Sequence, residues 1–144
     1  MQQDKKIEVP PLLLSAIVCE SVTRDYRTGR ITIKDIIETI DVAAYPVLQR
    51  DWMLYFELTD LHQSISVLVE VLDVLKNEEV LANREVEVPY QDPLEVVRVA
   101  LDLPAILFHH DGEYRIKISV GKRPPILLGE RRVVCREIEL PPLE

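Results

Sequence analysis

Residues 112–120, Gly-Glu-Tyr-Arg-Ile-Lys-Ile-Ser-Val, contain the most regular pattern in the chain. From Tyr114 to Val120 apolar and polar side chains alternate without a break. Successive side chains of an extended strand point to opposite faces, so this alternation is typical of a strand with one buried face. The stretch therefore predicts a β-strand that packs one side against a hydrophobic core.

The same period of two recurs along most of the chain, with turn-forming residues between the segments and no long helical pattern. Valine and isoleucine are abundant, and β-branched residues pack well on a pleated sheet. We therefore predict an all-β fold, a single antiparallel β-sandwich of seven or eight strands, immunoglobulin-like or jelly-roll-like. The other predicted strands lie within residues 12–18, 31–37, 52–59, 64–71, 97–103 and 127–138.

Two segments also fit a helical spacing. Apolar residues recur at i, i+3, i+4 and i+7 within residues 33–40 and again within residues 68–75. Isoleucine-rich segments form poor helices, and a β-bulge near Asp35 would change the strand parity in the same way. We assign strand to both segments and leave open whether either contains a helical turn.

The length of 144 residues corresponds to one domain. We assign residues 10–140 to the β-sandwich domain, residues 1–9 to a flexible N-terminal segment and residues 141–144 to a C-terminal tail. A composition of 47% hydrophobic and 29% charged residues is that of a soluble globular protein.

Net charge and targeting signals limit the partners. With 17 basic and 25 acidic residues the chain has a net charge of −8, which disfavours nucleic acid and anionic membrane surfaces. The longest uncharged run, Val9 to Cys19, is far shorter than the roughly 20 residues of a membrane span. No cleavage site follows it, and two cysteines are too few for a disulfide scaffold. We expect a cytoplasmic protein.

Gly112 and Tyr114 are predicted to be structural residues. A glycine two positions before a tyrosine, ahead of an alternating strand, is similar to the tyrosine corner of immunoglobulin-like sandwiches. There the hydroxyl hydrogen-bonds to the backbone a few residues upstream. Tyr114→Phe should then cost roughly 1–3 kcal/mol of stability.

Four further residues are also assigned structural roles. Gly29 closes the turn of residues 25–29, where a positive φ is needed. Trp52, Cys19 and Cys135 lie in apolar strand candidates and are expected in the core, because no histidine near either cysteine in sequence could activate it as a nucleophile.

His109-His110-Asp111 is a polar cluster and the only local group of candidate metal ligands. A zinc site needs three or four ligands, adjacent histidines of an extended chain face opposite ways, and nothing places His62 nearby. We therefore predict no metal site and interpret the three residues as an exposed turn. Their replacement by alanine should change stability by about 0.5 kcal/mol or less each.

With these segments placed, the chain resembles a bacterial family of small single-domain β-sandwich proteins of unknown function. The resemblance spans most of residues 11–138. Its motifs are packing and turn signals, and a glycine expected in the return strand is replaced by Asp35-Ile36. It implies no catalytic residue and no cofactor. The motifs are Ala16-Ile17-Val18-Cys19-Glu20, Thr28-Gly29-Arg30, the isoleucine-rich residues 31–37, Tyr45-Pro46 and Gly112 to Ile116.

No motif for catalysis, phosphate binding or a cofactor occurs in the chain. We expect a non-enzymatic module that binds another protein or takes part in an assembly, and homo-oligomerisation is compatible with this. The alternative is an enzyme or small-ligand-binding protein whose pocket gathers distant residues such as His62, His109, Asp111 and Arg115.

Overall fold

The computed structural model describes residues 9–90, 92–121 and 124–139, which form eleven strands and one short 3₁₀ helix. The predicted flexible segment 1–9 and the tail 141–144 fall almost wholly outside these residues. The elements are β1 Leu12–Arg24, β2 Ile31–Ile36, β3 Thr39–Val42, β4 Val47–Gln49, β5 Met53–Thr59, β6 Ile65–Asp73, η1 Val74–Lys76, β7 Glu79–Val88, β8 Val97–Asp102, β9 Ile106–Phe108, β10 Gly112–Val120 and β11 Ile126–Glu137.

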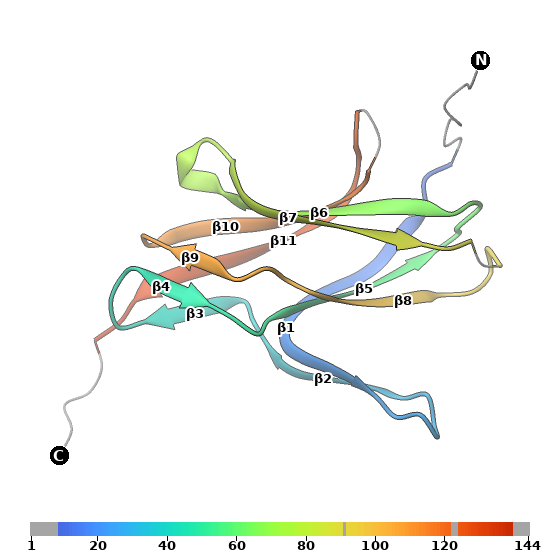
Figure 1. The fold of residues 1–144 in the computed structure, drawn as a ribbon, viewed down its shortest axis with the longest axis horizontal. Coiled ribbons are helices and arrows are strands. Elements are labelled where there is room, and N and C mark those ends of the chain that lie inside the picture. Colours follow the sequence, from blue (N-terminus) through green and yellow to red (C-terminus); the bar gives the residue numbers. More distant parts are fainter. Residues whose placement is uncertain (1–8, 91, 122–123, 140–144) are drawn as a thin grey trace.

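The strands form three sheets (Figure 1). The first has the order β2-β1-β5-β8, the second β3-β11-β10-β6-β7, and β4 pairs only with β9. All pairings are antiparallel except that of β3 with β11, which is parallel. The all-β prediction is confirmed. The prediction of a simple antiparallel sandwich of seven or eight strands is wrong.

The extra strands arise where the apolar pattern was weak or interrupted. β7 was not predicted, because most of its residues are exposed and it buries only its last one. Residues 31–40 do not form one return strand, because the chain leaves β2 at Ile36 and crosses to the other large sheet as β3. Asp35 has a φ of +54°, and this turn of the backbone comes just before the crossing.

The open question of helical turns has a different answer for each segment. Residues 33–40 contain strand and a bend but no helix. Residues 74–76 form the 3₁₀ helix, and the Asp73 side chain caps it by accepting a hydrogen bond from the Leu75 amide at 3.2 Å. A capping carboxylate satisfies an amide at the start of the helix that would otherwise lack a partner.

Apolar side chains from both large sheets make one core. Three aromatic rings cross it in sequence: Trp52 contacts Phe108 edge-on at 6.1 Å between centroids, and Phe108 contacts Tyr114 at 4.5 Å. The Trp52 indole donates a hydrogen bond to the Pro104 carbonyl at 2.9 Å, so its one polar atom is satisfied.

An arginine joins the two large sheets on each side of the domain. Arg131 of β11 donates from Nε to the Ala16 carbonyl of β1 at 2.6 Å. On the other side, Arg84 of β7 donates to the Asp102 carbonyl of β8. Thus β1 lies next to β11, and β8 lies next to β7. It follows that the terminal strands β2 and β7 lie on opposite sides of the domain.

Candidate functional site

At the turn between β9 and β10, Tyr114 has the burial and the hydrogen bond that are expected of a tyrosine-corner residue. Its ring is buried, with 1% of its surface exposed, and its hydroxyl donates to the His110 carbonyl at 3.1 Å. Gly112 has a φ of +144°, and a Cβ there would lie 2.7 Å from the Leu75 Cδ1 atom. Burial raises the pKa of Tyr114 to about 12, so the phenol stays protonated and keeps donating.

Tyr114→Phe is expected to lower the free energy of unfolding by about 1–3 kcal/mol, because the His110 carbonyl loses its donor while the ring packing survives. Urea unfolding measures the loss. Tyr26→Phe is the matched control, because Tyr26 is fully exposed and the same hydroxyl is removed in water. Equal urea midpoints for the two variants would show that Tyr114 is not a tyrosine-corner residue.

His110 is not the exposed turn residue that its neighbours suggested. Its Nε2 atom lies 2.6 Å from Asp73 Oδ2, and its Nδ1 atom lies 2.7 Å from the Asp111 carbonyl oxygen. Both partners accept hydrogen bonds, so the doubly protonated imidazolium satisfies both contacts at once. The Asp111 carbonyl and then the Asp73 carboxylate raise the pKa of His110, and burial opposes them.

Asp111 joins three segments. Its Oδ1 atom accepts hydrogen bonds from the Tyr45 hydroxyl at 2.5 Å and from the Glu137 amide at 2.7 Å. These bonds hold the pKa of Asp111 below its ordinary value, and burial with the Asp111 bond raises that of Tyr45. Asp111 therefore links the turn before β10 to the β3–β4 connection and to the end of β11.

His109 lies apart from this network, at a cavity of about 310 Å³ beside η1 and β9. Asp73, Lys76, Glu79 and Tyr114 also line the cavity. The sequence placed none of Asp73, Lys76 or Glu79 here, since they lie thirty or more residues before His109, on β6, η1 and β7. Asp73 could not be found from sequence, because an acidic residue after an apolar strand is read as the start of a turn.

The other residues of the alternative pocket do not join His109. His62 lies between β5 and β6 and contacts the Asp60 carboxylate at 2.9 Å. Arg115 is paired with Glu113 at 3.1 Å and with Glu78 at 3.7 Å. Within the described part of the chain, no three or more His, Cys, Asp and Glu side chains are grouped so that they could hold a metal ion.

Both cysteines are buried free thiols, Cys19 on β1 and Cys135 on β11. Burial raises the pKa of both, and burial followed by the Asp111 and Asp73 carboxylates raises that of Cys135 to about 12. A thiol with a raised pKa carries little thiolate at neutral pH and is a poor nucleophile. Gly29, the other structural prediction, has a φ of +72° in the β1–β2 turn.

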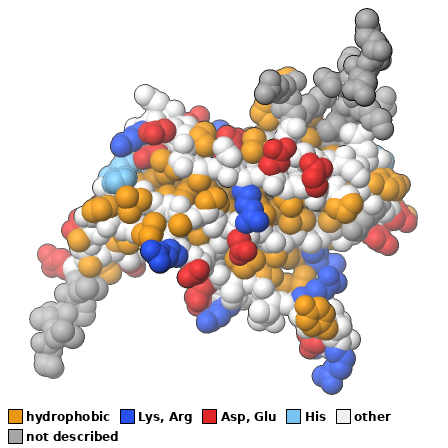
Figure 2. All heavy atoms as spheres, viewed as in Figure 1, with side chains coloured by type: hydrophobic (Ala, Val, Ile, Leu, Met, Phe, Trp, Pro, Cys, Tyr) orange, Lys and Arg blue, Asp and Glu red, His pale blue; other side chains and the backbone are white. Residues whose placement is uncertain are grey.

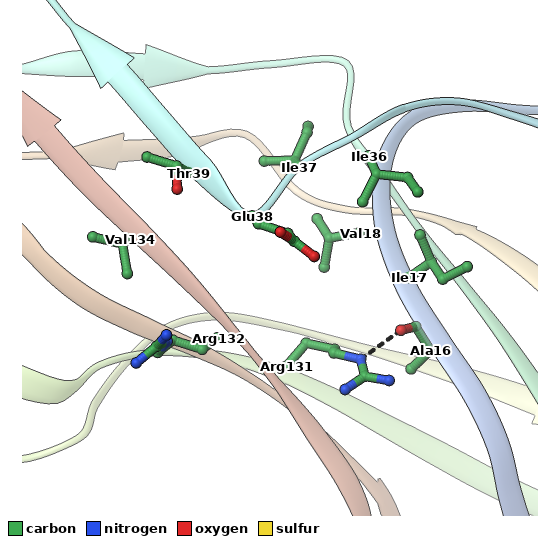
Figure 3. A pocket seen from close by; sticks show the side chains of 10 residues that line it. All are labelled: Ala16, Ile17, Val18, Ile36, Ile37, Glu38, Thr39, Arg131, Arg132 and Val134. Atoms are coloured by element: carbon green, nitrogen blue, oxygen red, sulfur yellow. Dashed lines mark hydrogen bonds between the residues drawn. The ribbon is translucent and has the colours of Figure 1, made fainter.

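A surface groove lies between β1 and β11, where the chain crosses from β2 to β3 (Figure 3). Its volume is about 550 Å³, and it is lined by apolar side chains of β1 and of the crossing and by two arginines of β11. Arg131 reaches across it to Ala16, whereas Arg132 turns away and contacts Glu113 at 3.5 Å. The Glu38 carboxylate points into the groove from the crossing (Figure 3).

Next to this groove, β1 and β2 continue as a two-stranded arm, defined here as residues 21–34. β1 pairs with β5 only as far as Cys19, so from Ser21 to Arg24 its one partner is β2. The arm projects from the body at the lower right of Figure 1. Its tip carries Tyr26, which is fully exposed.

Taken together, these features define an all-β domain with a projecting arm and a groove at the base of that arm. A hydrogen-bonded turn, residues 109–111, lies between β9 and β10. The chain belongs to the family of unknown function DUF6941, which it matches over residues 14–125. The expected resemblance to a family of unknown function is confirmed at this level. No curated protein matches the chain. Among the described residues no helix is long and apolar enough to cross a bilayer.

Proposed function

We propose that this domain is a non-enzymatic protein-interaction module that binds its partner through the arm and the groove at the arm's base. The observation that carries the proposal is that β1 and β2 extend beyond β5 as a two-stranded arm. An isolated two-stranded hairpin is at best marginally stable in water. A hairpin extended beyond its sheet gains from burial against a partner.

The arm offers both kinds of contact that a protein partner uses. The backbone of β2 that faces away from β1 forms the end of its sheet, and such an edge can pair with another strand. Apolar side chains lie along the arm and at its base: Tyr26 is fully exposed and Ile36 is 61% exposed. Aromatic side chains in particular are enriched in protein interfaces.

Two observations weigh against a catalytic role, one for the cavity beside His109 and one for the thiol of Cys135. Asp73 has both carboxylate oxygens engaged, one by His110 and one by the Leu75 amide. The thiol of Cys135 is buried with a raised pKa. We further propose a bacterial cytoplasmic location, in which free thiols such as those of Cys19 and Cys135 persist.

The experiment places a photo-reactive phenylalanine analogue at Tyr26 of the full chain in host cells. Leu94, which is 91% exposed in the β7–β8 connection, is the control position. We expect a protein adduct from position 26 and none from position 94. The captured protein, once purified, should bind the domain, and Arg27→Glu should weaken that binding while Leu94→Ser leaves it unchanged. No adduct at position 26, or the same adducts at both positions, would refute the proposal.

A further inference from the structure

The charge of the arm is opposite to that of the body. The arm carries four of the chain's 17 basic residues and one of its 25 acidic residues, so its net charge is +3 and that of the remaining chain is −11. The side chains of Arg24, Arg27 and Arg30 are exposed and form no ion pair within the described part of the chain. Lys34 contacts Glu20 at 3.7 Å. Figure 2 shows basic side chains on the projecting arm.

The opposite side of the domain ends in an acidic strand. β7 is the terminal strand of the five-stranded sheet, and its exposed residues include Glu79, Glu85 and Glu87. Its one basic residue, Arg84, is engaged with the Asp102 carbonyl. Asp92 follows in an exposed connection. Acidic side chains lie over β6 and β7 in the upper part of Figure 2.

These charges favour one way of pairing sheet edges between two copies of the chain. Two β7 edges repel each other, as do two arms, because like charges facing across paired strands are destabilising. An arm and a β7 edge attract each other. Since β2 and β7 lie on opposite sides of the domain, an arm cannot reach the β7 edge of its own chain, so the attraction acts between two molecules.

We propose that the arm of one copy docks along the β7 edge of a second copy. This inference rests on the proposed function, in which the arm is the contact surface, and adds the partner. β2 has six residues and β7 has ten, so the acidic edge is long enough to receive the arm. Because the two surfaces differ, the contact is head-to-tail, and repeated contacts give a ring or an open chain of copies.

The test is sedimentation velocity of the pure full chain over a wide range of protein concentration. In about 0.05 M salt, where charges are weakly screened, we expect self-association, and in about 0.5 M salt we expect it to be largely lost. Arg27→Glu and Glu87→Lys should each weaken association by about tenfold or more, because each places like charges across the contact. An equimolar mixture of the two variants should regain association, because the unchanged arm of the Glu87→Lys chain can meet the unchanged β7 edge of the Arg27→Glu chain.

Arg50→Glu and Glu139→Lys are the matched controls, because they make the same charge changes at exposed residues outside the arm and β7. They should associate as the unchanged protein does. A monomer at every concentration in low salt would overturn the inference, as would association unaffected by Arg27→Glu and Glu87→Lys. If the pure protein is monomeric while position 26 captures a different protein, the proposed function stands and only the second copy is excluded. If neither result is obtained, both proposals fail.

Discussion

Asp73→Ala is expected to lower the free energy of unfolding by about 3 kcal/mol. The Asp73 side chain is 4% exposed, and it is bonded both to His110 and to the Leu75 amide. The variant removes the acceptor of two hydrogen bonds, one from the His110 ring, whose side chain is 27% exposed, and one from the Leu75 amide, and hydrogen bonds to charged groups are worth about 1.5–3 kcal/mol each. The bond to the Leu75 amide is the cap of the 3₁₀ helix. Urea unfolding at pH 6 measures the difference.

The neighbouring histidines supply the control. His109→Ala should remain within about 0.5 kcal/mol of the unchanged protein, whereas His110→Ala should cost about 2 kcal/mol, because it leaves the Asp73 carboxylate buried without its partner. The expectation of equal, small effects for the whole turn is therefore revised for His110. If Asp73→Ala and His110→Ala each cost less than His109→Ala, the pair has no structural role.

The pH dependence has a definite sign. The folded pKa of His110 is raised above its ordinary value by the Asp111 carbonyl and then by the Asp73 carboxylate. The folded protein therefore holds this proton more tightly than the unfolded chain. The stabilisation by His110 is complete below about pH 6.5, the unfolded value, and is lost as the pH rises through the raised folded pKa. His110→Ala should remove this fall in stability.

Gly112→Ala is expected to cost about 2–3 kcal/mol, for two separate reasons. A φ of +144° is strained for any residue with a Cβ, and the new methyl group would lie 2.7 Å from Leu75 Cδ1. The backbone strain typically costs about 1–3 kcal/mol. The contact adds less than this, because Leu75 is 66% exposed and its Cδ1 atom is the end of a flexible side chain. Thermal and urea unfolding of the variant measure the total.

Gly29→Ala separates the two reasons. Gly29 has a φ of +72°, but no atom lies within 4 Å of the position of its Cβ. This variant should cost only about 1 kcal/mol, from the backbone alone. A loss at Gly112 no larger than that at Gly29 would mean that Leu75 moves aside and that the close approach contributes nothing.

The local pattern of apolar and polar residues was sufficient to predict the strands that bury one face. Alternation from Tyr114 to Val120 predicted the central strand β10, and similar patterns predicted β1, β5, β6, β8 and β11. A period of two depends only on which residues meet the core, so it is legible without knowing the partner strand. The position of Gly112 before Tyr114 is also a local relation, and it predicted a hydrogen bond across four residues.

The tertiary structure alone decided what depends on distant partners. β7 is largely exposed, its apolar alternation is confined to residues 85–88, and its place beside β6 is set by pairing. Asp73 and His110 are 37 positions apart, and only the pairing of β6 with β10 brings them within hydrogen-bonding distance. The arm exists because β5 begins only at Met53, opposite Cys19, while β1 and β2 extend beyond that point. The spacing of residues within one strand does not predict how far the neighbouring strand extends beside it.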